Sequence, residues 1–372
     1  ITGQVAASQT GRYRFGSCLL LLFFENYMQI ISVVQTDFTI YNKKKSNISK
    51  EDFMKKNIMI PNTDLHVLPL GLGTALAGLN FDGQEADRLF DTFLYLGGNM
   101  IDTARVYSDW VKPEIGRSER VIGDWLHRSK KRHDAVIVTK GGHPDMTVEK
   151  PDLHRSRMGR EDMRQDLEAS LRALQTDYID LYFYHRDDTS QSVEELTEVM
   201  EQFVREGKIR YYGCSNWSTK RMEEADAYCK KMGYRGFAAN QALYNLGSRF
   251  MKPLSDDTMV KADDEMLCYH QKNEKNVLMP YMGVCGGFFH KYITGGREAA
   301  ANSPYFVKEN MELAERVKIL TGKYNATVTQ VVLGFFTQQE TFSIPLYGPK
   351  NIAQMEEAVG MLDIAFEKAD FS

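Results

Sequence analysis

The chain has 372 residues, of which 43% are hydrophobic, with a formal net charge of −4 at pH 7 and a pI near 6.1. This length can bury a large core, and it suits a single α/β barrel of about 250 residues or more. The charge gives no sign of a polyanionic partner, so we expect no nucleic acid binding.

The cysteines indicate a reducing compartment. Five are present, an odd number without a CxxC pair: Cys18, Cys214, Cys229, Cys268 and Cys285. This usage favours free thiols in a cytoplasm over a disulfide scaffold or a zinc site. The sequence also contains no HxH, HExxH or P-loop motif. We therefore expect a cytoplasmic protein whose chemistry needs no metal ion.

The first fifty residues differ from the rest. Their longest apolar run, Cys18 to Phe24, is interrupted by Glu25 and is far shorter than the roughly 20 residues that a membrane-spanning helix needs. No clear cleavage site follows it, which disfavours a secretory signal. Met54 begins a stretch that resembles a bacterial start. We interpret residues 1–53 as a leader or extension outside the fold and residues 54–372 as one barrel domain. A genuine N-terminal extension is the alternative.

From residue 58 onward, short apolar runs alternate with segments of helical periodicity. Residues 58–67 predict a β-hairpin with Pro61 and Asn62 at its tip. Eight strands are predicted after it, at 68–74, 99–103, 135–140, 179–185, 209–215, 236–241, 277–282 and 342–347. Eight β–α repeats of uniform composition favour a closed (β/α)8 TIM barrel over an open doubly wound sheet.

Gly71-Leu-Gly73 lies in the first predicted barrel strand and could suggest a dinucleotide-binding loop. The Rossmann fingerprint requires a third small residue three positions later, where this chain has Leu76. We therefore interpret the pair of glycines as a tight turn.

The helix between the fourth and fifth predicted strands has clear boundary signals. Ser192 and Glu195 match a capping box, and Gly207 supplies the left-handed residue that ends the helix. Between them, apolar residues recur at helical spacing and predict one buried stripe, formed by Leu196, Val199, Met200, Phe203 and Val204.

Polar residues stand where three predicted strands end. Asp102, Lys140 and His185 close their strands, and Tyr107 follows Asp102 by five residues. Catalytic side chains of a barrel come from these C-terminal strand ends. A buried lysine needs an acidic partner, and a lysine held by an aspartate can lower the pKa of a nearby phenol, which makes that phenol a workable general acid. Individually, each residue could also be a helix cap, a solvated charge, a loop anchor or a structural histidine.

Several motifs in order resemble the aldo-keto reductase family, over a region from about Lys55 to about Leu362. The matching stretches are Gly98–Tyr107, Gly116–Arg120, Asp177–His185, Gly207–Asn216 and Asn240–Gln241. The chain resembles a bacterial member of this family, and the resemblance implies that the hairpin at residues 58–67 plugs the barrel floor. The resemblance also implies that Tyr107 gives a proton to the carbonyl oxygen, with Lys140, Asp102 and His185 in support.

The resemblance further implies a nicotinamide cofactor, NADPH with NADH possible. Ser215, Asn216 and Gln241 match positions that bind the carboxamide, and Tyr281 matches the residue whose ring stacks on the nicotinamide. A core aromatic is the alternative for Tyr281. The run from the last strand into a helix would bind the 2′-phosphate side through Gly348, Lys350, Gln354 and Glu357.

Three departures bear on the strength of cofactor binding. Met282-Gly283-Val284 stands where the family commonly has Ser-Pro-Leu, and Ala358 stands where many members have asparagine. Lys350 lacks the bidentate fork of the arginine that often reads the phosphate.

The substrate site is the least determined. Trp110 and Trp217 follow strand ends and are candidates for apolar substrate walls, with a packing role as the alternative. The segment 243–264 is long for a barrel loop, which is typical of a functional loop. We expect NADPH-dependent reduction of a small-molecule aldehyde or ketone, without a membrane partner. Alternatives are a sugar or alcohol dehydrogenase working in the oxidative direction and a cofactor-sensing regulatory subunit.

Overall fold

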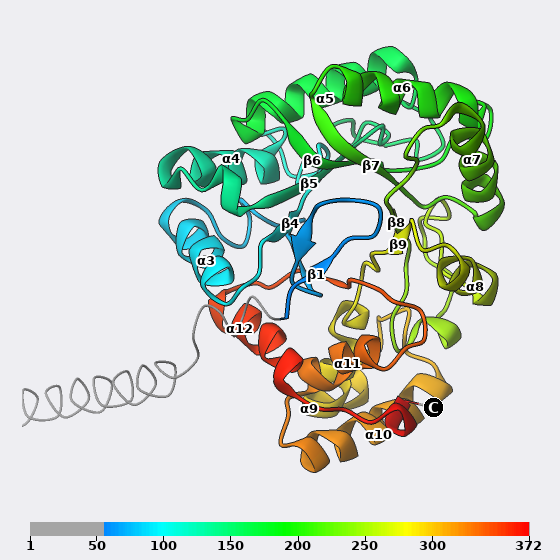
Figure 1. Ribbon diagram of the computed structural model, residues 1–372. Coiled ribbons are helices and arrows are strands. Elements are labelled where there is room, and N and C mark those ends of the chain that lie inside the picture. The colour runs from blue at the N-terminus through cyan, green and yellow to red at the C-terminus, as the bar shows by residue number, and fades with distance from the viewer. Residues whose placement is uncertain (1–55, 372) are drawn as a thin grey trace, which may run out of the picture. The chain divides into compact units, whose positions relative to one another are not determined.

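Eight parallel strands form one sheet whose order, β10-β3-β4-β5-β6-β7-β8-β9, follows the chain apart from the last strand (Figure 1). This computed structural model describes residues 56–371. The strands are β3 (Gly71–Gly73), β4 (Met100–Asp102), β5 (Val136–Gly141), β6 (Ile179–Tyr184), β7 (Ile209–Ser215), β8 (Ala239–Gln241), β9 (Val277–Leu278) and β10 (Leu346–Tyr347). The predicted leader or extension at residues 1–53 lies outside the described residues, so that boundary stays a prediction.

The two edges of this sheet meet and close the barrel. Leu278 of β9 bridges Ser343, just before β10. The Ile344 amide donates to the Leu278 carbonyl at 2.9 Å, and the Leu346 amide donates to the Pro280 carbonyl at 2.8 Å. The predicted (β/α)8 barrel is therefore confirmed. The last strands are shorter than predicted, because Pro280 and Pro345 have no N–H to give to a ladder.

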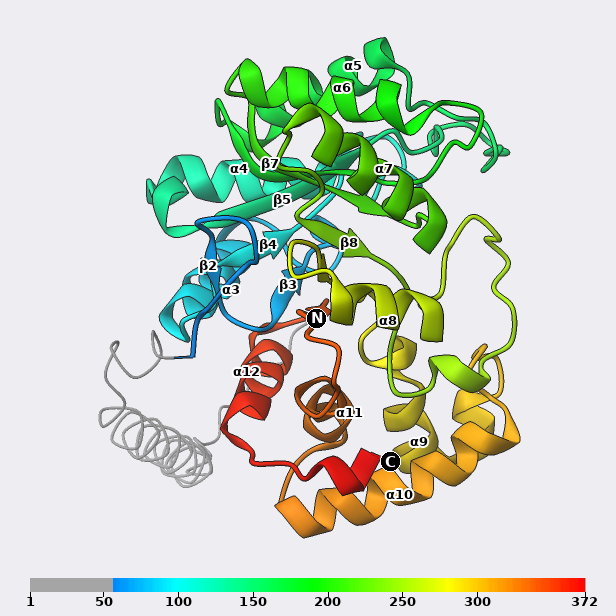
Figure 2. The same cartoon turned by 45° about the vertical axis from the view of Figure 1, so that its right-hand side comes forward.

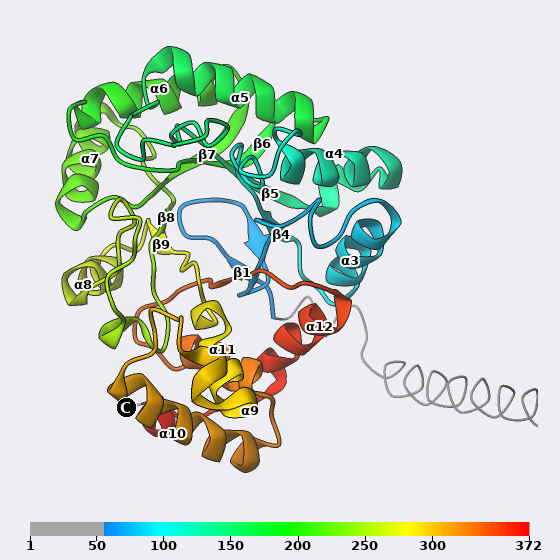
Figure 3. The same ribbon diagram turned by 180° about the vertical axis from the view of Figure 1, so that it is seen from behind.

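Helices connect the strands and lie outside them, as the views from opposite sides show for α3 to α7 (Figures 1 and 3). Their bounds are α3 (Gly83–Tyr95), α4 (Arg117–Ser129), α5 (Arg160–Leu174), α6 (Val193–Arg205), α7 (Thr219–Met232), α8 (Asp264–Lys272), α9 (Phe288–Ala300), α10 (Lys308–Tyr324), α11 (Val328–Thr337) and α12 (Ile352–Gly360). Three helices, α9 to α11, separate β9 from β10 and gather on one side of the barrel (Figure 2). Among the described residues, none of the helices combines the length and apolar character that a membrane crossing requires.

The predicted hairpin is present and closes the barrel floor. Strands β1 (Ile58–Met59) and β2 (His66–Val67) pair antiparallel. Ile60, Leu65 and Val67 are buried in the same apolar cluster as interior residues of the barrel strands. Burying these side chains keeps water out of the barrel interior beneath the site.

The boundary signals of α6 are confirmed. The Ser192 side chain accepts from the Glu195 amide while the Glu195 side chain accepts from the Ser192 amide, which satisfies two N–H groups that the helix start leaves open. Gly207 has a φ of 71°, in the left-handed region.

One glycine sets how closely two helices approach. A Cβ on Gly123 of α4 would lie 2.1 Å from the Ala173 carbonyl oxygen of α5, whereas one on Gly322 of α10 would meet nothing within 4 Å. We expect Gly123→Ala to lower the free energy of unfolding by about 1–3 kcal/mol through overpacking. Gly322→Ala should raise it by up to about 1 kcal/mol, because alanine is the better helix former. Urea unfolding of both variants checks this, and equal effects at the two positions would contradict it.

Candidate active site

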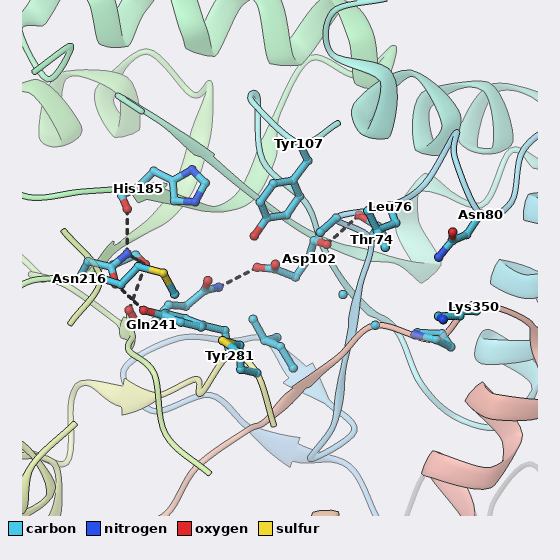
Figure 4. Close-up of a pocket in the computed structure, with 18 of the residues that line it drawn as sticks. Thr74, Leu76, Asn80, Asp102, Tyr107, His185, Asn216, Gln241, Tyr281 and Lys350 are labelled. Carbon is cyan, nitrogen blue, oxygen red and sulfur yellow. Dashed lines mark hydrogen bonds between the residues drawn. The ribbon is translucent and has the colours of Figure 1, made fainter. Parts of the chain in front are cut away.

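A cavity of about 400 Å³ opens at the C-terminal ends of the barrel strands (Figure 4). Parallel strand ends meet at one rim, so residues far apart in sequence line it together. Residues predicted from the sequence that line it are Asp102, Tyr107, His185, Ser215, Asn216, Gln241, Tyr281, Gly348 and Lys350. Others that line it were not predicted as site residues: Gly73, Thr74, Ala75, Leu76, Asn80, Phe81, Arg186, Met259, Met282, Leu346 and Pro349.

Lys140 lies beneath this cavity with its ammonium fully engaged. Its Nζ donates to Asp102 Oδ1 at 2.7 Å, to the Thr103 carbonyl at 2.7 Å and to the Tyr107 hydroxyl at 3.1 Å. Burial acts to lower the pKa of Lys140, but Asp102 and Tyr107 outweigh it, so the pKa is raised above its ordinary value. Burial raises the pKa of Asp102, and the ammonium of Lys140 opposes that rise. The lysine is therefore charged at neutral pH.

Tyr107 stands at the cavity wall, on the loop after β4, with its hydroxyl directed at this ion pair (Figure 4). Burial raises the pKa of Tyr107 above its usual value, while the charge of Lys140 acts in the opposite direction. The lowering influence expected of Lys140 is present, but burial is the larger effect. At neutral pH the phenol therefore carries a proton that it can donate.

His185 follows β6 and lies against Tyr107, with ring centroids 5.7 Å apart in an edge-to-face arrangement. Burial lowers the pKa of His185 well below its usual value, and the nearby His143, Arg186 and Lys140 add to the effect. The imidazole is neutral, so one of its two nitrogens donates and the other accepts.

Gln241 connects β8 to the ion pair across the barrel. Its Nε2 donates to Asp102 Oδ2 at 2.7 Å, so both carboxylate oxygens of Asp102 have partners. Nothing in the local sequence could indicate this contact, because 139 residues separate the two side chains. The backbone carbonyl oxygen of Gln241 accepts from the Asn216 amide and from Ser215 Oγ, whereas its side-chain Oε1 has no hydrogen-bond partner among residues 56–371. Oε1 can therefore accept from an amide N–H of a ligand.

Asn216 organises the wall beside Gln241. It has a φ of 62°, and its Nδ2 donates to the His185 carbonyl and to Ser215 Oγ. Its Oδ1 accepts from the Tyr281 hydroxyl at 2.6 Å and from the Val260 amide at 3.0 Å. Asn216 is thus satisfied within the protein, and its contacts hold Tyr281 and the long loop 243–264 at the cavity. A hydroxyl, an amide and an aromatic ring at one wall suit a planar amide-bearing ring such as nicotinamide.

Residues between β10 and α12 line two cavities. Gly348 and Lys350 also line a second cavity of about 320 Å³, together with Gln354 and Glu357. The Lys350 amide donates to Gln354 Oε1, and Asn351 caps α12 by accepting from the Gln354 amide. A cation beside a helix N-terminus suits a phosphate group. The two cavities share Gly348 and Lys350, and their donors together fit a nicotinamide dinucleotide.

Arg186 lines the cavity wall, although it was not predicted as a site residue. Its guanidinium donates to Thr258 Oγ1 at 2.8 Å, to Asp256 at 2.9 Å and to the His185 carbonyl at 3.0 Å. It therefore ties the loop 243–264 to the end of β6. The sequence signal that pointed to a role for this loop was its length.

Trp110 and Trp217, the two tryptophans predicted as substrate walls, do not line the cavity. Trp217 is fully buried, donates from Nε1 to the Arg186 carbonyl and packs against Tyr184 and Phe237. Trp110 is 46% exposed and is not among the residues lining the cavity. The packing alternative thus describes Trp217 in this structure, since its side chain is enclosed by protein.

Two departures from the family pattern also have defined places. Met282, with a φ of 57°, lines the main cavity, and Ala358 is buried in α12.

Within residues 56–371, no group of three or more His, Cys, Asp or Glu side chains could hold a metal ion.

Burial lowers the pKa of His143, which lies beside His185, from 6.5 to about 4, and Arg186 adds to the effect. Below pH 6.5 the unfolded chain binds a proton that the folded chain does not, so stability falls as the pH drops toward 4. Between pH 7 and pH 5 the free energy of unfolding should fall in both proteins. We expect this fall to be about 2 kcal/mol smaller in His143→Phe than in the wild type. Urea unfolding at both pH values measures this. A variant of the exposed His133 serves as the control, and an unchanged decline in His143→Phe would refute the assignment.

Comparison with known proteins agrees with this geometry. The sequence model of the Aldo/keto reductase family matches residues 69–372. Norsolorinic acid reductase B of Aspergillus parasiticus is 33% identical over 313 residues, which cover 78% of this chain and 76% of that protein. The aryl-alcohol dehydrogenase of Pestalotiopsis microspora is 26% identical, covering 85% and 80%. An uncharacterized oxidoreductase, YrpG of Bacillus subtilis, is also 26% identical, covering 82% and 90%.

The match spans the barrel and the segments that carry the cavity residues. The chain therefore belongs to the aldo/keto reductase family and is an NAD(P)H-dependent oxidoreductase acting on carbonyl or alcohol groups of small molecules.

Proposed function

We propose that the chain reduces an aldehyde or ketone with NADPH and that Tyr107 is the general acid. One observation carries the proposal: the ammonium of Lys140 donates both to the Tyr107 hydroxyl, in the cavity wall, and to the Asp102 carboxylate. When bound, the cofactor supplies a hydride to the carbonyl carbon. The protein must then supply a proton to the carbonyl oxygen.

Each member of the group has a distinct task. Tyr107 gives its hydroxyl proton to the carbonyl oxygen, and the charge of Lys140 stabilises the phenolate that remains. Asp102 holds Lys140 charged and in place. His185 is neutral and donates a hydrogen bond from Nε2 that orients the carbonyl oxygen.

The cofactor is proposed to lie across the two cavities that share Gly348 and Lys350. Tyr281 offers a ring face for the nicotinamide, and the free side-chain Oε1 of Gln241, together with Ser215, binds its carboxamide. Lys350 at the start of α12 favours a 2′-phosphate, with Gln354 and Glu357 beside it. Lysine lacks a bidentate fork, so the preference for NADPH over NADH is expected to be incomplete.

The nearest alternative to carbonyl reduction is the reverse reaction, in which the chain oxidises a sugar or an alcohol. The names of the relatives include both reductases and a dehydrogenase. A regulatory subunit that only senses the cofactor would bind it without turnover. A panel of aldehydes, ketones and sugars with NADPH and NADH, followed by absorbance of the reduced cofactor, separates these functions.

We also infer a cytoplasmic location, which is supported by free thiols on the four cysteines of the described region.

Tyr107→Phe should lower kcat by about 10²- to 10⁴-fold, because phenylalanine cannot donate the proton. NADPH affinity, measured by fluorescence titration, should change less than twofold, since the hydroxyl does not hold the cofactor. A variant with near-normal kcat would rule out the proposed acid. Lys140→Met should likewise lose activity and should also shift the pH profile, because the charge that stabilises the phenolate is gone.

Lys350→Glu should shift the ratio of kcat/KM for NADPH over NADH about tenfold toward NADH, because a carboxylate replaces the cation facing the phosphate. Lys231→Glu on α7 makes the same charge change outside both cavities and should leave the ratio unchanged. Equal ratios in the wild type and Lys350→Glu would show that Lys350 does not read the phosphate.

A further inference from the structure

A second histidine packs on the proposed substrate-orienting histidine. His143 follows the end of β5 by two residues and is only 8% exposed. Its ring lies edge-to-face against His185, with centroids 4.7 Å apart and planes at 60°. Tyr107 packs on His185 at 5.7 Å, also edge-to-face. The His185 imidazole therefore touches two rings, of which only Tyr107 belongs to the cavity lining.

The backbone that carries His143 is held firmly. The Gly142 amide donates to Asp166 Oδ2 at 2.9 Å, and Arg157 donates to Asp166 Oδ1 at 2.9 Å and to the His143 carbonyl. Gly142 has a φ of 78°, a conformation that glycine adopts at little cost. This ion pair and turn place the His143 ring with little freedom to move away from His185.

Hydrogen bonding defines what the two rings can do. His143 Nδ1 lies 2.9 Å from the Pro144 carbonyl oxygen, which can only accept, so the proton of the neutral ring is on Nδ1. His185 Nδ1 is buried without a hydrogen-bond partner among residues 56–371. His185 Nε2 is thus the nitrogen left to serve a ligand, and it must carry the proton in order to donate.

Within the described part of the chain no hydrogen bond orients the His185 imidazole, so ring packing must do so. Resting on the function proposed above, we propose that His143 is a positioning residue that holds the His185 ring plane with Nε2–H directed at the carbonyl oxygen of the substrate. The charged groups nearby are Arg186, Arg157, Lys140 and Asp256. A neutral aromatic ring at position 143 adds no further charge beside His185.

A double-mutant cycle tests this role. His143→Ala should lower kcat about tenfold, because a misplaced donor weakens catalysis, while the KM for NADPH stays within about twofold. In a His185→Ala background the same substitution should cost less than about twofold, since the group it positions is gone. His143→Phe keeps a neutral ring of similar size and should recover most of the lost kcat.

Two kinetic outcomes would overturn the inference: equal losses of kcat in both backgrounds, or a kcat of His143→Phe no higher than that of His143→Ala. Absence of turnover by the wild type, or no effect of His185→Ala, would instead refute the proposed function. Ring nitrogen NMR shifts of His185 give a readout that needs no activity. They should change in His143→Ala and stay close to wild type in His143→Phe, and unchanged shifts in His143→Ala would also overturn the inference.

Discussion

The ion pair between Lys140 and Asp102 is the constraint on which the rest of the site depends. Both side chains are almost completely buried, at 1% and 2% exposure. Removing two charges from water costs several kcal/mol per ion, so such a pair persists only when its remaining donors and acceptors are satisfied. The three protons of Lys140 are all used, and Gln241 takes the second oxygen of Asp102. Satisfying this one pair therefore joins β4, β5, β8 and the Tyr107 loop.

Barrel closure makes these contacts possible. The parallel register places the ends of neighbouring strands side by side, as with Ser215 opposite Gln241. Closure between β9 and the segment before β10 then brings β8 and the start of α12 round to the same rim. The hairpin seals the other end with apolar side chains. An apolar floor and a polar rim leave the charged pair in a water-poor environment, where its field on Tyr107 is strongest.

The site combines a buried ion pair with neutral imidazoles. Lys140 stays protonated because its partners outweigh burial, whereas His185 and His143 stay neutral because burial prevails and cations lie nearby. Arg186 contributes to that field and also ties the loop 243–264 to the rim through Asp256 and Thr258. The same low-dielectric surroundings thus keep the lysine charged, because it has an acidic partner, and keep the histidines neutral, because they have none among residues 56–371.

Local signals in the sequence were sufficient for the repeating β–α order, the capping box of α6 and the polar residues at strand ends, because each depends on neighbours within a few residues. Tertiary structure alone decided the hydrogen bond from Gln241 to Asp102, the contacts of Arg186 with the loop 243–264 and the packing of His143 on His185. It also enclosed Trp217 behind Tyr184, away from the cavity. Periodicity reports which face of an element is apolar, but contacts between side chains distant in sequence exist only once the barrel has closed.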